Sequence, residues 1–207
     1  MLVRERMISP GKWVSPGFPI SSVFEIFDQA KPHWLPVVDP EGRLMGLITK
    51  SDVQRAHAYF SENADKETSE KSAQDFMTVN YLSVTEKTPI EEAARIMIDY
   101  GFSELPVVKD GFFTGVITEK TMLRILMEIT GARRQGVRLM VELENKNGEI
   151  LNLLELIRDQ EGTVQGICTY CAQENEYLIV TLRVDGVDKY MLKQAVRNQG
   201  YKVIDIR

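Results

Sequence analysis

The first 55 residues of this chain are repeated, with substitutions, at residues 71–124, and this duplication constrains the fold more than any other feature. LPVV stands at 35–38 and again at 105–108, while Met7 recurs as Met77 at the same offset of 70. GLIT at 46–49 returns as GVIT at 115–118, one residue early because the intervening turn is shorter. A fixed period predicts one supersecondary unit built twice. Two such units are expected to pack together and leave two related clefts, where small ligands bind.

Each copy is predicted to have the order β-α-β-β-α. A short extended piece precedes a helix that a proline opens, Pro19 in the first copy and Pro89 in the second. Apolar residues at helical spacing support both helices, and Gly101 is expected to end the second one. The LPVV strands return through turns at 39–42 and 109–111 as LMGLIT and FTGVIT. Second helices then follow, starting near SDVQR and KTMLR.

The last part of the chain has a different pattern. VRLMVELE alternates as a strand, 149–160 is an amphipathic helix, and two strands, a helix ending at Gly200 and a final strand follow. This is the ferredoxin-like order βαββαβ. The predicted domains are repeat 1 at 1–59, a polar linker at 60–72, repeat 2 at 73–130, a second linker at 131–136 and the tail at 137–207. Arg133 and Arg134 in the second linker either bind an anion or are solvated.

Composition narrows the classes of function. A net charge of −5 argues against a nucleic-acid partner, and no apolar segment has the ~18 residues of a membrane span. The N-terminus lacks the apolar stretch of a secretory signal, so we expect a cytoplasmic protein. Cys168 and Cys171 lie in a predicted strand, where residues three apart point to opposite faces, so they are interpreted as inert. The two histidines, His33 and His57, have no clustered ligands, so no metal site is predicted.

The sequence contains no recognisable catalytic motif, and the chemistry it suggests is recognition. The stretch 46–52 takes a strand into the start of a helix, where free N–H groups favour phosphate. Thr49 and Ser51 add hydroxyl donors, Lys50 adds a cation, and the Asp52 carboxylate can accept hydrogen bonds from two ribose hydroxyls. An equally good interpretation is that Ser51 or Asp52 only caps the helix.

LPVVDPEGRLMGLITKSDV, preceded by a helix that a proline opens, resembles the cystathionine-β-synthase (CBS) domain, as does the second copy. The resemblance covers about residues 1–130 and implies a tandem CBS pair that binds adenosine-containing ligands in clefts built from both repeats. It implies a principal nucleotide cleft of Thr49, Lys50, Ser51, Asp52, Thr78, Leu82, Phe102 and Ser103. It implies a second cleft of Lys12, Pro32, His33, Thr118, Lys120 and Thr121.

The two copies differ at one position that matters for binding. Asp52 aligns with Thr121, so the second cleft lacks the carboxylate that the family uses for ribose. A hydrogen bond to a charged group contributes about 1.5–3 kcal/mol. The hypothesis is therefore that the Asp52 cleft is the principal site and the second is weaker.

The tail resembles an ACT domain, a regulatory module that binds small ligands. The corresponding turn is Asn145-Lys146-Asn147-Gly148, in which Gly148 matches the family but its acid and proline are missing. Amino-acid binding at Asn145, Asn147 and Gly148 competes with a simpler role in dimerisation or partner docking. The whole layout resembles the bacterial acetoin-utilisation protein B family.

The fold class expected is α/β (α+β), a tandem CBS pair followed by a ferredoxin-like ACT domain. The function expected is non-catalytic: sensing AMP, ADP, ATP or S-adenosylmethionine, with no required cofactor. The expected partners are a second copy of the chain, in a homodimer, and a regulated enzyme. Three alternatives stand beside it, which are an enzyme with an unfamiliar site, a structural interaction module without a ligand, and an ACT-mediated amino-acid sensor.

Overall fold

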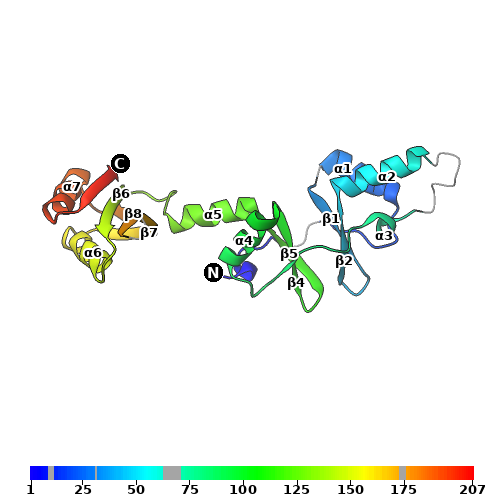
Figure 1. The fold of residues 1–207 in the computed structure, drawn as a ribbon, viewed down its shortest axis with the longest axis horizontal. Helices are drawn as coiled ribbons and strands as arrows, with labels where there is room; N and C mark the ends of the chain where they lie inside the picture. Colours follow the sequence, from blue (N-terminus) through cyan, green and yellow to red (C-terminus); the bar gives the residue numbers. More distant parts are fainter. Residues whose placement is uncertain (9–11, 31, 63–70, 173–175) are drawn as a thin grey trace. The chain divides into compact units, whose positions relative to one another are not determined.

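The structure is a computed structural model that describes residues 1–8, 12–30, 32–62, 71–172 and 176–207. Most of its helices and strands are labelled in Figure 1. The chain divides into two compact units, Met1–Met122 and Leu123–Arg207, which are described separately. Most of the predicted linker 60–72 lies outside the described residues, although α2 includes its first three positions and Ser72 precedes α3.

The second repeat has the predicted order β-α-β-β-α, and the first has it without the leading strand. The first contains α1 (Ile20–Ala30), β1 (Trp34–Val38), β2 (Leu44–Thr49) and α2 (Lys50–Glu62). The second contains β3 (Val84–Thr85), α4 (Ile90–Tyr100), β4 (Glu104–Lys109), β5 (Phe112–Thr118) and α5 (Glu119–Ile129). In each, an LPVV strand pairs antiparallel with the strand that follows it. The extended piece of the first copy is a single parallel bridge from Val14 to Val37, whereas the second copy forms β3, which pairs parallel with β4.

The helix boundaries agree with their local chemistry. Gly101 ends α4 in the left-handed conformation, at φ 70°, as the sequence predicted. Pro89 is the N-cap of α4 and not its first helical residue.

The apolar faces of α1 and α2 enclose a core with Ile20, Val23 and Ile48, all at most 2% exposed. Amphipathic spacing predicted the burial of Val23 and Phe27 in α1 and of Ala93 and Met97 in α4, whereas Ala30 and Tyr100, at the ends of these helices, are exposed.

Two short segments cross between the repeats. Residues 1–8, which include η1 (Val3–Glu5), pair with the second repeat through bridges from Leu2 to Pro89 and from Ile8 to Val116. Residues 71–78, which include α3 (Ala73–Phe76), pair with the first repeat through bridges from Pro19 to Ser72 and from Leu47 to Thr78. Each repeat is thus completed by the segment that precedes the other repeat in the sequence.

Equivalent glycines allow this exchange. A Cβ atom on Gly46 would lie 2.9 Å from the Thr78 carbonyl oxygen, and one on Gly115 would lie 2.6 Å from the Ile8 carbonyl oxygen. Real Cβ atoms do not approach backbone this closely, so a glycine is required wherever the exchanged segment crosses the strand. The glycines of GLIT and GVIT are therefore required for packing against the exchanged segments, and not only as a result of the duplication.

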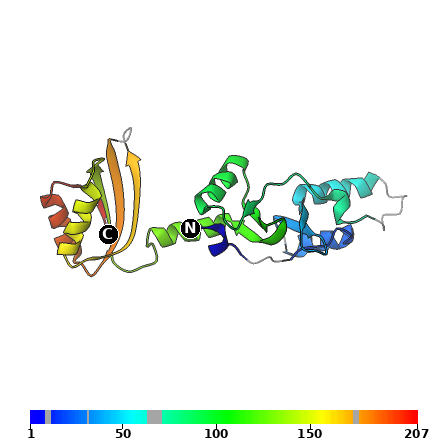
Figure 2. The same ribbon diagram turned by 90° about the horizontal axis from the view of Figure 1, so that it is seen from below.

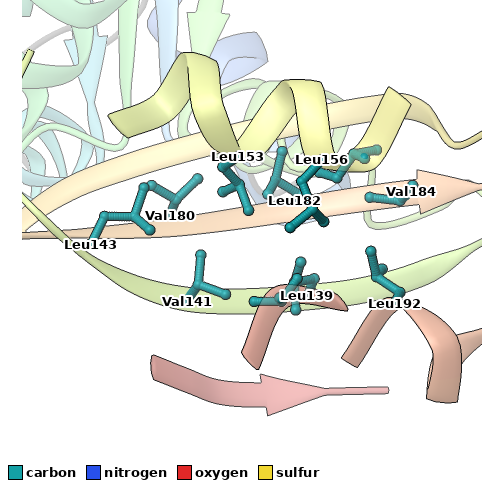
Figure 3. Packing of buried hydrophobic residues seen from close by; sticks show 11 residues of the cluster. Leu139, Val141, Leu143, Leu153, Leu156, Val180, Leu182, Val184 and Leu192 are labelled. Carbon is teal, nitrogen blue, oxygen red and sulfur yellow. The ribbon is translucent and has the colours of Figure 1, made fainter. Parts of the chain in front are cut away.

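The second unit contains β6 (Val137–Glu144), α6 (Glu149–Asp159), β7 (Thr163–Ala172), β8 (Tyr177–Asp185), α7 (Lys189–Asn198) and β9 (Lys202–Ile206). Its sheet is antiparallel, in the order β7-β8-β6-β9, which confirms the predicted βαββαβ order and the ferredoxin-like arrangement. Figure 2 shows α6 and α7 on one face of this sheet. Figure 3 shows the core between this sheet and the two helices, with Leu153 and Leu156 of α6 facing Val180 and Leu182 of β8.

Cys168 and Cys171 lie in β7, the strand in which the sequence placed them, and both are free thiols. Cys168 is half-buried and Cys171 is exposed. No helix among the described residues is long and apolar enough to cross a membrane. In the same part of the chain, no three histidine, cysteine or acidic side chains form a group that could hold a metal ion.

Candidate functional site

Asp52 lies at the start of α2 and is 1% exposed. Its Oδ2 accepts hydrogen bonds from the Thr49 backbone N–H and the Thr49 hydroxyl, each at 2.8 Å. The Asp52 backbone N–H donates in return to Thr49 Oγ1 at 3.3 Å. This is a reciprocal capping box, with Thr49 as the N-cap. Neither Ser51 nor Asp52 is therefore the N-cap that the sequence left open; Thr49 is, and Asp52 completes the capping box as the third residue of the helix.

The same carboxylate also contacts the segment that arrives from the second repeat. The Thr78 hydroxyl lies 3.1 Å and 3.2 Å from the two Asp52 oxygens. Arg55 Nη2 donates to Asp52 Oδ1 at 2.6 Å and to the Phe76 carbonyl at 2.9 Å. Because the Arg55 side chain is 63% exposed, its ion pair forms the outer side of this network. Asp52 thus joins a helix start in the first repeat to the exchanged segment.

Among the residues predicted for the principal cleft, Thr49, Asp52 and Thr78 are brought together. Lys50 and Ser51 are exposed in the first turn of α2. Leu82 and Phe102 are each 39% exposed, and no hydrogen bond described for the chain joins them to Asp52. Ser103 is exposed, and its carbonyl accepts the Glu119 N–H at 2.9 Å, at the start of α5. The position of these residues as base-framing groups stays a prediction.

A hollow of about 350 Å³ lies where the second cleft was predicted. Three predicted residues, Lys12, Pro32 and His33, line it. The remaining lining residues come from both repeats and are Ile26, Ala30, Trp34, Leu35, Pro36, Glu104, Phe113 and Val116. The structure therefore unites the first-repeat half of the prediction around a cavity of the size that small ligands occupy.

The second-repeat residues predicted for this cleft lie at the turn into α5. Thr118 Oγ1 accepts the Thr121 N–H at 3.2 Å, and the two hydroxyl oxygens are also 3.2 Å apart. Thr121 is 6% exposed, and Lys120 is exposed. None of Thr118, Lys120 and Thr121 is among the residues that line the hollow. Their part in binding remains a prediction.

Trp34 and Glu104 are the two residues with polar side-chain groups among the eight lining residues that were not predicted from the sequence. Burial raises the pKa of the Glu104 carboxyl, and the nearby His33 partly opposes this. The Trp34 indole nitrogen is buried, and it has no hydrogen-bond partner in the described structure. Trp34 and Glu104 are equivalent residues, 70 positions apart, immediately before the two LPVV strings. Their equivalent positions, immediately before the two LPVV strings, were the sequence signal that could have identified them.

The predicted ACT ligand turn joins β6 to α6. Gly148 is the N-cap of α6 and has φ 91°, a conformation that favours glycine. Asn145 and Asn147 are exposed, and Lys146 forms an ion pair with Glu144. That ion pair and its hydrogen bond raise the pKa of Lys146. The geometry explains Gly148 as a turn residue, and a ligand at this turn stays a prediction.

Comparison with known families decides what the repeats are. The CBS domain family matches residues 3–59 and 73–128, which together make up more than half of the chain. The chain belongs to the CBS domain family. Its curated relatives include an uncharacterized 17.7 kDa protein of Acidianus ambivalens, which is 29% identical over 54% of this chain and 66% of that one. They also include the uncharacterized protein MJ1225 of Methanocaldococcus jannaschii, which is 27% identical over 69% of this chain and 49% of that one. The chain thus spans about half to two thirds of the length of these relatives.

Solved CBS structures agree with the fold. CBSX2, in complex with AMP, is 27% identical and has a TM-score of 0.54, over 62% of this chain and 97% of that one. The CBS domain pair of protein MJ0100, in complex with 5-methylthioadenosine and S-adenosyl-L-methionine, is 26% identical and has a TM-score of 0.50, over 65% and 98%. A putative acetoin utilization protein (AcuB) from Vibrio cholerae has a TM-score of 0.55 over 64% and 95%, but at 19% identity it supports the fold alone.

Proposed function

We propose that this protein is a non-catalytic regulator that senses an adenosine-containing ligand, such as AMP, ADP, ATP or S-adenosylmethionine, at the seam between its CBS repeats. The observation that carries the proposal is the position of Asp52, which meets Thr78 of the exchanged segment at the start of α2. A ligand held there would contact both repeats. The complexes of CBSX2 with AMP and of MJ0100 with two adenosyl compounds support this ligand class.

Ribose binding at Asp52 requires an exchange of partners. The carboxylate already accepts hydrogen bonds from Thr49, Thr78 and Arg55. Arg55 is the partner that solvent reaches, so vicinal hydroxyls would replace its contact while Thr49 keeps the helix capped. Released from Asp52, the guanidinium would be available for a phosphate group, a geometry that arginine favours.

The hollow at the second cleft supports a second ligand position. Lys12 and His33 supply cationic or proton-donating groups, and Trp34 supplies an aromatic surface. Glu104 adds a carboxylate that would oppose a phosphate group in the same space. This cleft would therefore favour an adenosyl compound with less negative charge than the compound bound at Asp52.

Regulation needs only that the ligand bind two arrangements of the chain with different affinity. The ferredoxin-like tail, interpreted as an ACT-like domain, would relay the change to a homodimer partner or to a regulated enzyme. A role in acetoin or central carbon metabolism follows only from the resemblance of the whole layout. Neither a nucleic acid nor a membrane is part of this proposal.

A structural role without a ligand is the second candidate, and one observation favours it. Asp52 has a full set of hydrogen-bond partners within the protein, so the network needs no ligand to be satisfied. An ACT-mediated amino-acid sensor has no comparable support at the Asn145–Gly148 turn.

Titration calorimetry on the full chain, with AMP, ADP, ATP and S-adenosylmethionine, separates these functions. Asp52→Asn should weaken binding of the preferred ligand by about 10-fold or more, because a hydrogen bond to a charged acceptor is lost. Asp75→Asn is the matched control. Asp75 forms the same kind of capping box with Ser72, at 2.8 Å and 3.0 Å, in α3.

The control variant should lose stability and keep its affinity for the ligand. Equal affinity of the wild type and Asp52→Asn would contradict the assignment of Asp52. If none of the four ligands binds to the wild type, the structural role is supported instead.

A further inference from the structure

The tail sheet has two edge strands, and only one of them is protected against pairing with a further strand. The order β7-β8-β6-β9 leaves β7 and β9 with one neighbour each. β9 has five residues, includes Lys202 and Asp205, and pairs irregularly with β6. β7 has ten residues, none of which is charged and none of which is proline. Natural edge strands are usually short, charged or bulged, because an unpaired edge accepts another strand.

Protection of β7 is confined to its beginning. The pairing of β7 with β8 is bulged at Gln165, whose Oε1 accepts a hydrogen bond from Arg134 Nη1 at 2.7 Å. From Gly166 to Ala172, by contrast, each residue pairs regularly with β8. On the other side of this segment, the described part of the chain supplies no bridge and no backbone hydrogen bond. We call residues 166–172 the free edge.

The helix beside the free edge exposes apolar surface on the same side. α6 packs near β6 and β7, whereas α7 packs near β9, so α6 is the helix closer to the free edge. Leu151 of α6 is 60% exposed, and Leu154, one turn later, is half-buried. Neither lines the groove between α6 and α7, so helical spacing places both on the side of α6 that faces away from α7. A single extended peptide could pair with the free edge but would leave Leu151 uncovered.

A second copy of this chain would cover both the strand and the helix. A two-fold axis would pair the free edge antiparallel with itself and would bring the Leu151 sides of two α6 helices together on one face. Self-pairing places each side chain opposite one from the same segment, so a charge near the axis would face its own copy. The free edge contains no charge. Its middle residue is Thr169, and a threonine opposite a threonine is a favourable cross-strand pair.

We propose that the free edge of β7 pairs antiparallel with the free edge of a second copy, about a two-fold axis at Thr169, so that the two tail sheets join into one. The homodimer expected from the sequence would then have an interface in the tail unit, formed by β7 and α6. This interface does not depend on ligand binding by the repeats.

Hydrogen exchange on the full chain, followed amide by amide, tests the pairing. Backbone N–H groups along the free edge point alternately toward β8 and toward the open side. When the free chain concentration is about 10 times the dissociation constant, the open-side amides should exchange about 10-fold more slowly than at high dilution. Thr169→Lys puts a charge opposite its own copy and should remove this slowing. Thr163→Lys, at an exposed position of the same strand before the bulge, is the matched control and should keep it.

A cysteine at the axis identifies the occupant of the edge. In a chain that carries Cys168→Ser and Cys171→Ser, Thr169→Cys should form a disulfide between two chains under mild oxidation. The reason is that Cα atoms of opposite residues in paired strands are about 4.5–5.5 Å apart, within the range of a disulfide. Ile204→Cys, at a 44% exposed position on β9, is the matched control and should stay a single chain on a non-reducing gel.

Three results would overturn the proposal. Open-side amides that exchange as fast as unprotected amides at every concentration of the wild type would show that the edge is unpaired. Slow exchange that persists in Thr169→Lys would show that a different segment covers the edge. Equal yields of covalent dimer from Thr169→Cys and Ile204→Cys, or no dimer from either, would show that Thr169 does not lie at a two-fold axis. A dimer too tight to dissociate on dilution would still lose its slow exchange in Thr169→Lys, and that result supports the pairing.

Discussion

At the scale of single residues, Asp52 and Thr121 show how one substitution gives two copies of the same turn different contacts. Both are buried, and both follow a threonine that caps the helix. Asp52 adds contacts to Thr78 and Arg55, whereas the segment that crosses the second repeat carries Ile8 at the position of Thr78. The alignment of the repeats predicted the loss of the carboxylate at Thr121. It did not predict the loss of its hydroxyl partner, because that partner arrives from a distant segment.

Glu104 gives a pH-dependent prediction at the same scale. Burial raises its pKa above the ordinary value of 4.5, so the folded chain holds this proton at a pH where the unfolded chain has released it. Stability from this group therefore falls as pH rises through the raised pKa, and the penalty persists at neutral pH. Glu104→Gln should raise the free energy of unfolding at pH 7 and have no such effect at about pH 4, below the ordinary pKa.

Urea denaturation at the two pH values measures the Glu104 effect. Glu25→Gln, at an exposed position in the middle of α1, is the matched control and should change stability little at either pH. A Glu104→Gln variant that is less stable than the wild type at pH 7 would show that the carboxylate has an unrecognised favourable partner.

At the scale of elements, Gly115 tests the exchange of segments. Its replacement by alanine places a Cβ atom 2.6 Å from the Ile8 carbonyl oxygen, so the N-terminal segment must move away from β5. Gly115→Ala should lower the free energy of unfolding by about 1–3 kcal/mol, as overpacking does. Gly17→Ala is the control, because a Cβ atom there meets nothing within 4 Å. Equal stability of the two variants would mean that residues 1–8 do not hold the second repeat.

The same elements show how far the sequence could be interpreted. The long helices and paired strands were predicted because each has a periodic apolar face or an alternating pattern. The 3-residue η1 and the 4-residue α3 were not, because they are too short to show a period. Ser72 and Asp75 did carry the spacing of a capping box, which was the one available signal for α3. The exchange of segments has no local signature, since the bridges of residues 1–8 join positions 87 and 108 apart, and those of residues 71–78 join positions 53 and 31 apart.

At the scale of the whole molecule, α5 belongs to both compact units. It begins at the Thr118–Thr121 turn of the second repeat, and the division between units falls within it, after Met122. Its last residues and the turn that follows pack on the tail sheet at Gly166. The sequence predicted a break at 131–136, after this helix, because glycine and arginine there interrupt the apolar pattern. Composition locates a linker, but only tertiary contacts show which unit the end of a helix joins.

Hydrogen exchange on the full chain tests whether a ligand signal passes along this connection. AMP at 100 times its Kd should stabilise the binding unit by about 2.7 kcal/mol, which slows exchange of its most protected amides by about 100-fold. The slowing should include Leu47 and Thr78, whose backbones pair at the seam, at 3.0 Å and 2.8 Å. If the tail relays the signal, exchange should also change at the end of α5 and in β7. At the same AMP concentration, the Asp52→Asn variant should show both effects weakened together, with the slowing reduced to about 10-fold if its Kd is about 10-fold higher. A response confined to Met1–Met122 in the wild type would contradict the relay while leaving the binding site intact.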